Sequence, residues 1–144
     1  MTADDRAQVV FGSFDGLVSA LGMVLALALT HSPALVTAAV ALAVASAASM
    51  GAGEWLADTG GSLRRASVMA AATLAGSITP ALPFIVGGGP AAFVACGLLT
   101  GAWVVVIAEV RPGAPLPSYA KTAGVLVAAT ALGLGASILA GGAG

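Results

Sequence analysis

Charged residues are scarce in this sequence. Only 8% of its 144 residues are Asp, Glu, Lys or Arg, against roughly 25% in an ordinary soluble domain. This scarcity excludes a disordered chain, which needs high polarity, and it leaves a soluble globule without enough polar surface. A formal net charge of −1 argues against nucleic-acid binding, and a single cysteine excludes a disulfide framework. With 59% hydrophobic residues, the sequence indicates an integral membrane protein in contact with the lipid bilayer.

Three long segments carry no Asp, Glu, Lys or Arg, and they are 16–53, 66–108 and 122–144. A membrane-spanning helix needs about 20 apolar residues. Proline and glycine interrupt the first two segments at 30–33 and 87–90, where loops are favoured. We therefore predict five spans in a single transmembrane domain covering 1–144, at about 9–29, 34–57, 66–86, 91–110 and 119–140.

The fold class predicted is an all-α polytopic membrane protein with five transmembrane helices. The segments are apolar throughout, whereas the strands of a membrane barrel alternate apolar and polar residues. Pro80 and Pro83 are expected to kink or break the third helix near its outer end. Gly-x-x-x-Gly spacings at 12–16 and 97–101 permit close helix contacts.

The basic residues predict the orientation. With five spans, all of them fall on one side of the membrane, and they are Arg6, Arg64, Arg65, Arg111 and Lys121. Basic loops face the cytoplasm, so the N-terminus is expected to be cytoplasmic. The acidic start of the chain lacks the basic region of a secretory signal, so the first apolar stretch is predicted to be a permanent helix.

Acidic residues inside hydrocarbon are costly and usually functional. Asp15 lies within the first predicted span, and Met50, Glu54 and Asp58 follow an i, i+4, i+8 spacing that places them on one face of the second. Because the first two helices run antiparallel, Asp15 and Glu54 are expected at similar depth. Carboxylate oxygens suit Mg²⁺, Ca²⁺ and Mn²⁺, and a thioether shifts the preference toward softer metals. These residues are therefore the candidate metal ligands.

Each candidate also has a structural interpretation. Asp15 is an interfacial residue in that interpretation, Met50 packs against a neighbouring helix, and Asp58 pairs with Arg64 or Arg65 at a helix end. The remaining polar residues are expected to be structural. Asp4 and Asp5 belong to a solvated tail, Glu109 pairs with Arg111, His31 lies in a turn and Cys96 fills apolar space.

Three segments resemble the vacuolar iron transporter family. Residues 10–18 (VFGSFDGLV) resemble its first-helix Asp-Gly-Leu motif, and residues 49–56 (SMGAGEWL) resemble its second-helix Ser-Met-x-x-Gly-Glu-Tyr segment, with Trp in place of Tyr. Residues 76–84 (GSITPALPF) resemble its third-helix Gly-x-x-x-Pro-x-x-Pro segment. The segments occur in the same order as in the family.

This resemblance implies a homodimer that moves Fe²⁺ or Mn²⁺ out of the cytosol in exchange for protons. The metal is then a transported substrate, and no tightly bound cofactor is expected. The family's first-helix Asp, second-helix Met and following Glu correspond to Asp15, Met50 and Glu54. A short bacterial member in the plasma membrane is expected from the Ala- and Gly-rich composition.

Two features depart from the family pattern. Leu42 stands where well-studied eukaryotic members carry a further acid, and only about 58–65 occupies the place of their cytoplasmic metal-binding domain. A non-transporting structural or regulatory subunit is therefore the alternative, and an exporter of organic cations is a third hypothesis. An enzyme is not expected, because no Ser/His/Asp, Cys/His or His-x-x-x-His arrangement occurs.

Overall fold

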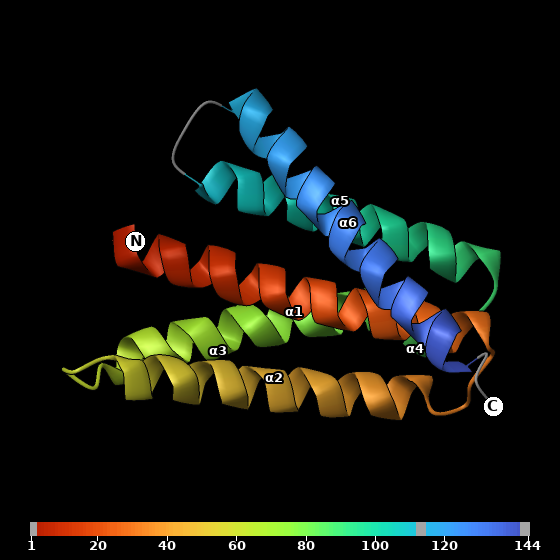
Figure 1. Cartoon of the computed structure of the whole chain (residues 1–144), viewed down its shortest axis with the longest axis horizontal. Coiled ribbons are helices and arrows are strands. Elements are labelled where there is room, and N and C mark those ends of the chain that lie inside the picture. The colour runs from red at the N-terminus through yellow and green to blue at the C-terminus, as the bar shows by residue number, and fades with distance from the viewer. Residues whose placement is uncertain (1–2, 112–114, 142–144) are drawn as a thin grey trace.

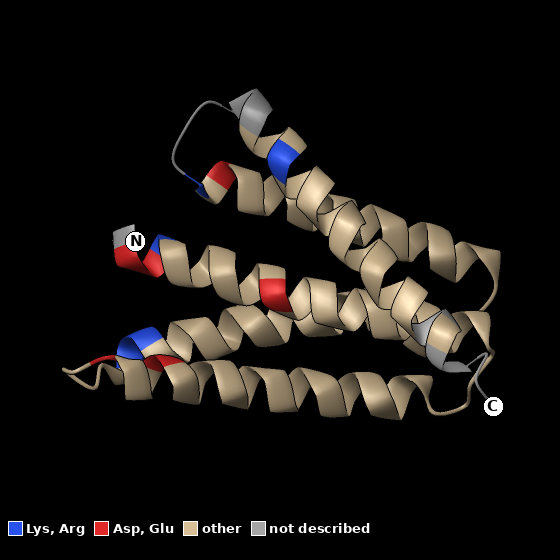
Figure 2. Ribbon diagram, in the orientation of Figure 1, with Lys and Arg blue, Asp and Glu red and all other residues tan. Residues whose placement is uncertain are grey.

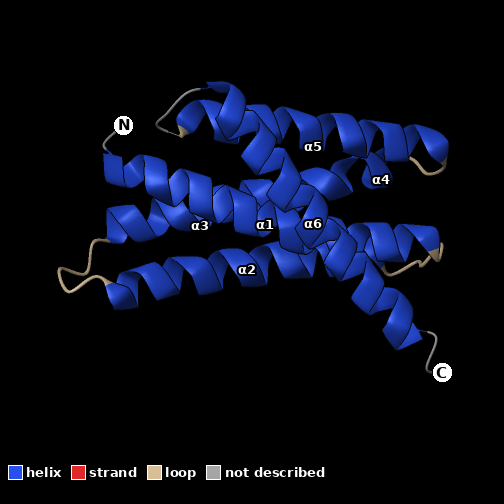
Figure 3. Cartoon of the chain, turned by 45° about the horizontal axis from the view of Figure 1, so that its top comes forward, coloured by secondary structure: helices blue, strands red, loops and turns tan. Residues whose placement is uncertain are grey.

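Helices make up almost all of the structure, a computed structural model that describes residues 3–111 and 115–141 (Figures 1 and 3). No strand occurs in these two ranges. The elements are α1 (Ala3–Leu29), α2 (Leu35–Ala57), α3 (Leu63–Ile78), the 3-10 turn η1 (Thr79–Ala81), α4 (Leu82–Val86), α5 (Pro90–Val110) and α6 (Pro115–Gly141).

The fold class is confirmed. Among the described residues, five helical segments are long and apolar enough to cross a membrane, and they are Asp4–Leu29, Leu35–Ala57, Leu63–Val86, Pro90–Val110 and Ser118–Ala136. Each corresponds to one predicted span. The largest difference is at the start of the chain, where α1 begins at Ala3 rather than at residue 9 because polar residues extend the helix beyond its apolar part.

Helices α1, α2 and α3 form one closely packed unit. Helix α3 packs extensively against both α1 and α2, whereas the direct contact between α1 and α2 is much smaller. Helix α2 buries a stripe of small residues at i, i+4 spacing, namely Ala39, Ala43, Ala47 and Gly51. At Gly51 this stripe meets α3, because an added Cβ would lie 2.9 Å from Cβ of Ala70. In Figure 1, α5 lies on the opposite side of α1 from α2, and α6 crosses α1 obliquely.

Glycine allows the backbones of α1 and α3 to touch. A Cβ atom built on Gly16 would lie 2.3 Å from the carbonyl oxygen of Thr73, and one on Gly76 would lie 2.2 Å from that of Ser13. Both distances are far shorter than a van der Waals contact, so only glycine fits at these positions. The close contact predicted for the spacing 12–16 is therefore confirmed. At Gly97 and Gly101, by contrast, an added Cβ would meet no described atom within 4 Å.

The proline pair ends α3 as predicted. Pro80 lies in η1, and Pro83 opens the short helix α4. The indole Nε1 of Trp103 on α5 donates a hydrogen bond of 2.9 Å to Oγ1 of Thr79, which anchors α5 to this break. Phe84 and Phe93 pack edge to face with their ring centroids 5.2 Å apart. The break thus joins the three-helix unit to α5.

Charged residues gather at one end of the helices (Figure 2). Asp15 is an exception, since it lies roughly 18 Å along the axis of α1 from Ala3 at 1.5 Å per residue. The orientation of this end toward the cytoplasm stays a prediction.

The contact between α1 and α3 is tested by replacing Gly16 with alanine. Because the added methyl group meets a backbone carbonyl, we expect Gly16→Ala to destabilise the protein by about 1–3 kcal/mol or to prevent folding. Gly97→Ala is the matched control and is expected to be neutral or stabilising by up to about 1 kcal/mol, since alanine favours helices. Thermal unfolding in detergent measures both. Equal melting temperatures of the two variants would contradict the packing argument.

Candidate functional site

Asp15 lines an open hollow between α1 and α2. The hollow has a volume of about 290 Å³, and its lining consists of Asp15, Ala45, Ser46, Ser49 and Met50. It therefore combines one carboxylate, one thioether and two hydroxyl groups within the predicted membrane span. This set of oxygen and sulfur atoms is suited to a first-row transition metal ion.

Glu54 lies one helical turn beyond Met50, toward the charged end. Its carboxylate is only 15% exposed. Gln8 on α1 donates a hydrogen bond from Nε2 to Oε1 of Glu54 at 2.8 Å, and Nε of Arg65 on α3 lies 3.3 Å from the same oxygen. Glu54 thus joins all three helices of the packed unit.

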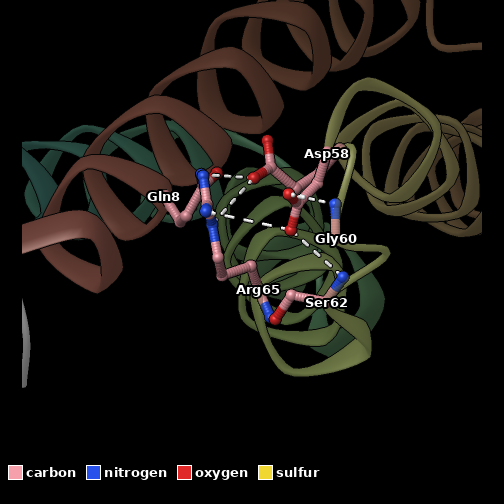
Figure 4. Close-up of polar contacts among 6 residues, drawn as sticks. Gln8, Asp58, Gly60, Ser62 and Arg65 are labelled. Carbon is pink, nitrogen blue, oxygen red and sulfur yellow. Dashed lines mark hydrogen bonds and ion pairs between the residues drawn. The ribbon is translucent and has the colours of Figure 1, made fainter.

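Asp58 follows the last residue of α2 and holds the loop to α3. Its Oδ1 accepts the backbone N–H of Gly60, and its Oδ2 accepts that of Ser62, both at 3.1 Å. These two hydrogen bonds, with a smaller contribution from Arg65, hold the pKa of Asp58 below its ordinary value. Nη1 of Arg65 lies 3.8 Å from Oδ2 of Asp58. Figure 4 shows these contacts around the Arg65 side chain.

The structure separates the candidate ligands into two groups. Asp15 shares the hollow with Met50, whereas Glu54 and Asp58 share Arg65. On α1, the partner of Glu54 is Gln8, roughly 10 Å from Asp15 along the helix axis at 1.5 Å per residue. The expectation that Asp15 and Glu54 lie at similar depth is therefore wrong. In the part of the chain that the structure describes, no three His, Cys, Asp or Glu side chains come together to hold a metal ion.

The prediction that Asp5 belongs to a solvated tail is wrong. Its side chain is buried, with 3% exposure, and its Oδ2 accepts a hydrogen bond of 2.6 Å from Nη2 of Arg64. The buried positions Asp5, Gln8, Gly12 and Gly16 recur at i, i+3 and i+4 spacing. Extending the helical periodicity backward from Gly16 would have revealed this face of α1, and with it both polar residues.

The other structural expectations had mixed outcomes. The pair of Glu109 with Arg111 is wrong, because Tyr119 donates its hydroxyl hydrogen to Glu109 and Arg111 donates from Nη1 to Oγ1 of Thr122 at 3.3 Å. His31 lies in the turn after α1 with a positive φ of 51°, as predicted. Cys96 is buried in an apolar core cluster and is a packing residue, as predicted.

These features define an integral membrane protein with a carboxylate and thioether hollow among its first helices. Residues 7–60 match the family model described as VIT family, and this segment contains most of α1, all of α2 and every candidate ligand. This part of the chain is therefore similar to the vacuolar iron transporter family. No curated protein and no solved structure matches the chain.

The role of Asp58 in the loop is tested by its pH dependence. Because its pKa in the folded protein is below the ordinary value of 3.8, the ionised carboxylate stabilises the fold at neutral pH. That contribution is lost as the pH falls through the folded-state pKa. We expect Asp58→Asn to lower the melting temperature at about pH 7 and to have much less effect at about pH 3. Asp4→Asn, on an exposed residue of α1, is the control. A melting difference that is the same at both pH values would contradict this role.

Proposed function

We propose that the protein exports Fe²⁺ or Mn²⁺ from the cytosol across a bacterial plasma membrane in exchange for protons. The observation that carries this proposal is the hollow in which Asp15 lies beside Met50 within the predicted spans. Acids at this depth are costly and are retained for ion pathways. The family match over residues 7–60 supports the same function.

Two stations along α1 and α2 form the proposed path. The charged end offers Glu54 beside Gln8. At 1.5 Å per residue, Met50 lies roughly 6 Å deeper than Glu54 along α2, and Asp15 lies roughly 10 Å deeper than Gln8 along α1. Both oxygens of Asp58 accept backbone N–H groups, so we propose that Asp58 adds negative charge at the entrance. A metal ion that loses its bound water is coordinated by the carboxylate of Glu54 at the first station. At the second station it is coordinated by the carboxylate of Asp15 and the thioether of Met50.

Proton exchange follows from the chemistry of these ligands. A carboxylate binds a metal ion only in its ionised form, so binding displaces any proton that it carries. After the metal leaves, the same oxygens accept protons from the opposite side. Transport in one direction is thereby coupled to proton movement in the other.

A homodimer would complete the site. One copy brings one carboxylate, one thioether and two serine hydroxyl groups to the hollow, so only a single negative charge faces a divalent metal ion there. A second copy placed around a shared path would double the acids that face the ion. We therefore include homodimerisation in the proposal.

The assignment of the acids is tested in proteoliposomes that report metal and proton flux together. We expect Asp15→Asn and Glu54→Gln each to reduce Fe²⁺- or Mn²⁺-dependent proton flux by about tenfold or more, because each removes a charged ligand. Glu109→Gln is the matched control, since Glu109 lies at the same charged end but contacts Tyr119 on α6. Its flux should equal that of the wild type.

Each possible result of this experiment decides between the hypotheses. Wild-type flux in both ligand variants would refute the site assignment. A wild type that folds but moves no metal would favour the non-transporting subunit, to which Leu42 and the short loop between α2 and α3 point. Flux of organic cations without metal dependence would favour the third hypothesis.

The thioether is tested separately by Met50→Leu, which keeps the apolar volume and removes the sulfur. Because sulfur favours softer metals over Mg²⁺ and Ca²⁺, we expect the rate for Fe²⁺ relative to Mg²⁺ to fall by about threefold or more. Competition between the two ions in the same vesicles measures this ratio. Met23→Leu on α1, a methionine outside the hollow, should leave it unchanged. An unchanged ratio in Met50→Leu would show that Met50 only packs.

A further inference from the structure

We propose that Arg65 is a resident counter-ion of Glu54 that a divalent metal ion must displace, so that Arg65 sets the metal affinity and excludes monovalent cations. This inference rests on the proposed transport function and concerns its entrance station. It assigns to α3 a residue that controls specificity.

The position of Arg65 is determined by the start of α3. Ser62 caps this helix and accepts the backbone N–H of Arg65 with its side chain at 3.4 Å. From there the guanidinium group reaches back to α2, where Nε lies 3.3 Å from Glu54 and Nη1 lies 3.8 Å from Asp58. Figure 4 shows the Arg65 side chain and its contact with Asp58. Arg65 thus places a positive charge where an entering metal ion would bind.

The contact of Arg65 with Glu54 is loose. Its Nε is buried but makes no hydrogen bond to a described atom, so the 3.3 Å contact is an ion pair without hydrogen-bond geometry. Arg64, its neighbour, instead makes a hydrogen-bonded pair of 2.6 Å with Asp5. Of the two adjacent arginines, Arg65 holds its carboxylate partner less tightly, so Arg65 is the one that a metal ion can displace.

Gln8 supplies a second observation at the same place. Its side chain is nine-tenths buried, and while Nε2 donates to Glu54, its carbonyl Oε1 has no hydrogen-bond partner among the described residues. An unpaired buried acceptor is costly and calls for an explanation. A cation bound to Glu54 would satisfy Oε1 of Gln8 as well, because amide oxygens are metal ligands. The arrangement with Arg65 therefore leaves one ligand atom available for the metal.

Charge and distance favour a divalent ion in this exchange. A small divalent ion about 2.1 Å from a carboxylate oxygen has roughly three times the Coulomb attraction of a single positive charge at the ion-pair distance of Arg65. A monovalent ion has no charge advantage over a guanidinium group that is tethered at high local concentration. Displacement of Arg65 therefore selects for divalent ions.

The test compares Arg65→Gln with Arg64→Gln. Both remove one positive charge from the start of α3, but only the first frees Glu54. We expect Arg65→Gln to lower the KM for Mn²⁺ uptake and the Kd for Mn²⁺ in detergent by about three- to tenfold, the latter measured from the electron paramagnetic resonance signal of free Mn²⁺. Arg64→Gln and Arg65→Lys should stay within about twofold of the wild type. Sodium ions should inhibit Mn²⁺ uptake by Arg65→Gln and not by the wild type.

A purely structural role of Arg65 would weaken Mn²⁺ binding or leave it unchanged, so either result in Arg65→Gln would overturn the inference. Arg65→Met, which keeps the apolar stem and removes the charge, gives the same comparison if Arg65→Gln does not fold. A wild type that neither binds nor transports Mn²⁺ would overturn the proposed function and this inference together. A wild type that does both, with Arg65→Gln equal to Arg64→Gln, would overturn the role of Arg65 alone.

Discussion

The close contact between α1 and α3 is the constraint on which the rest of the structure depends. At Gly16 and Gly76 the backbone of one helix lies directly on the other, which leaves no room for a side chain. Helix α3 also packs extensively against α2, whereas α1 and α2 contact each other much less. The hollow beside Asp15 lies between these two loosely joined helices. Tight packing on one side of the unit thus permits an open site on the other.

A low-dielectric surrounding also determines how the charged end is built. Removing a charge from water is costly unless a partner is close, and three carboxylates of the three-helix unit at this end have close partners. Asp5 is paired with Arg64, Glu54 contacts Gln8 and Arg65, and Asp58 is held by loop amides. Asp15 differs, because it lies deeper and faces a hollow rather than a cation.

The contrast between Arg64 and Arg65 shows how adjacent residues acquire different roles. Successive residues of a helix point in different directions, so one guanidinium reaches α1 and the other reaches α2. The first is bound closely to a buried acid and serves stability. The second lies near two acids at longer distances and can be exchanged for another cation. Neither the type of residue nor its charge distinguishes them, and only their partners do.

The amino-acid sequence alone determined the helical class, the number of spans and the proline break, because the hydrocarbon thickness and the φ restriction of proline act on local segments. It also identified Asp15, Met50, Glu54 and Asp58 as candidates, since an acid within an apolar run is conspicuous by itself. Only the tertiary structure decided that Asp5 is buried and that Gln8 rather than Asp15 is level with Glu54. It also decided that the guanidinium group of Arg65 lies beside the carboxylate of Glu54. These contacts join residues distant in the chain, and they depend on the depth and rotation of packed helices, which periodicity does not specify.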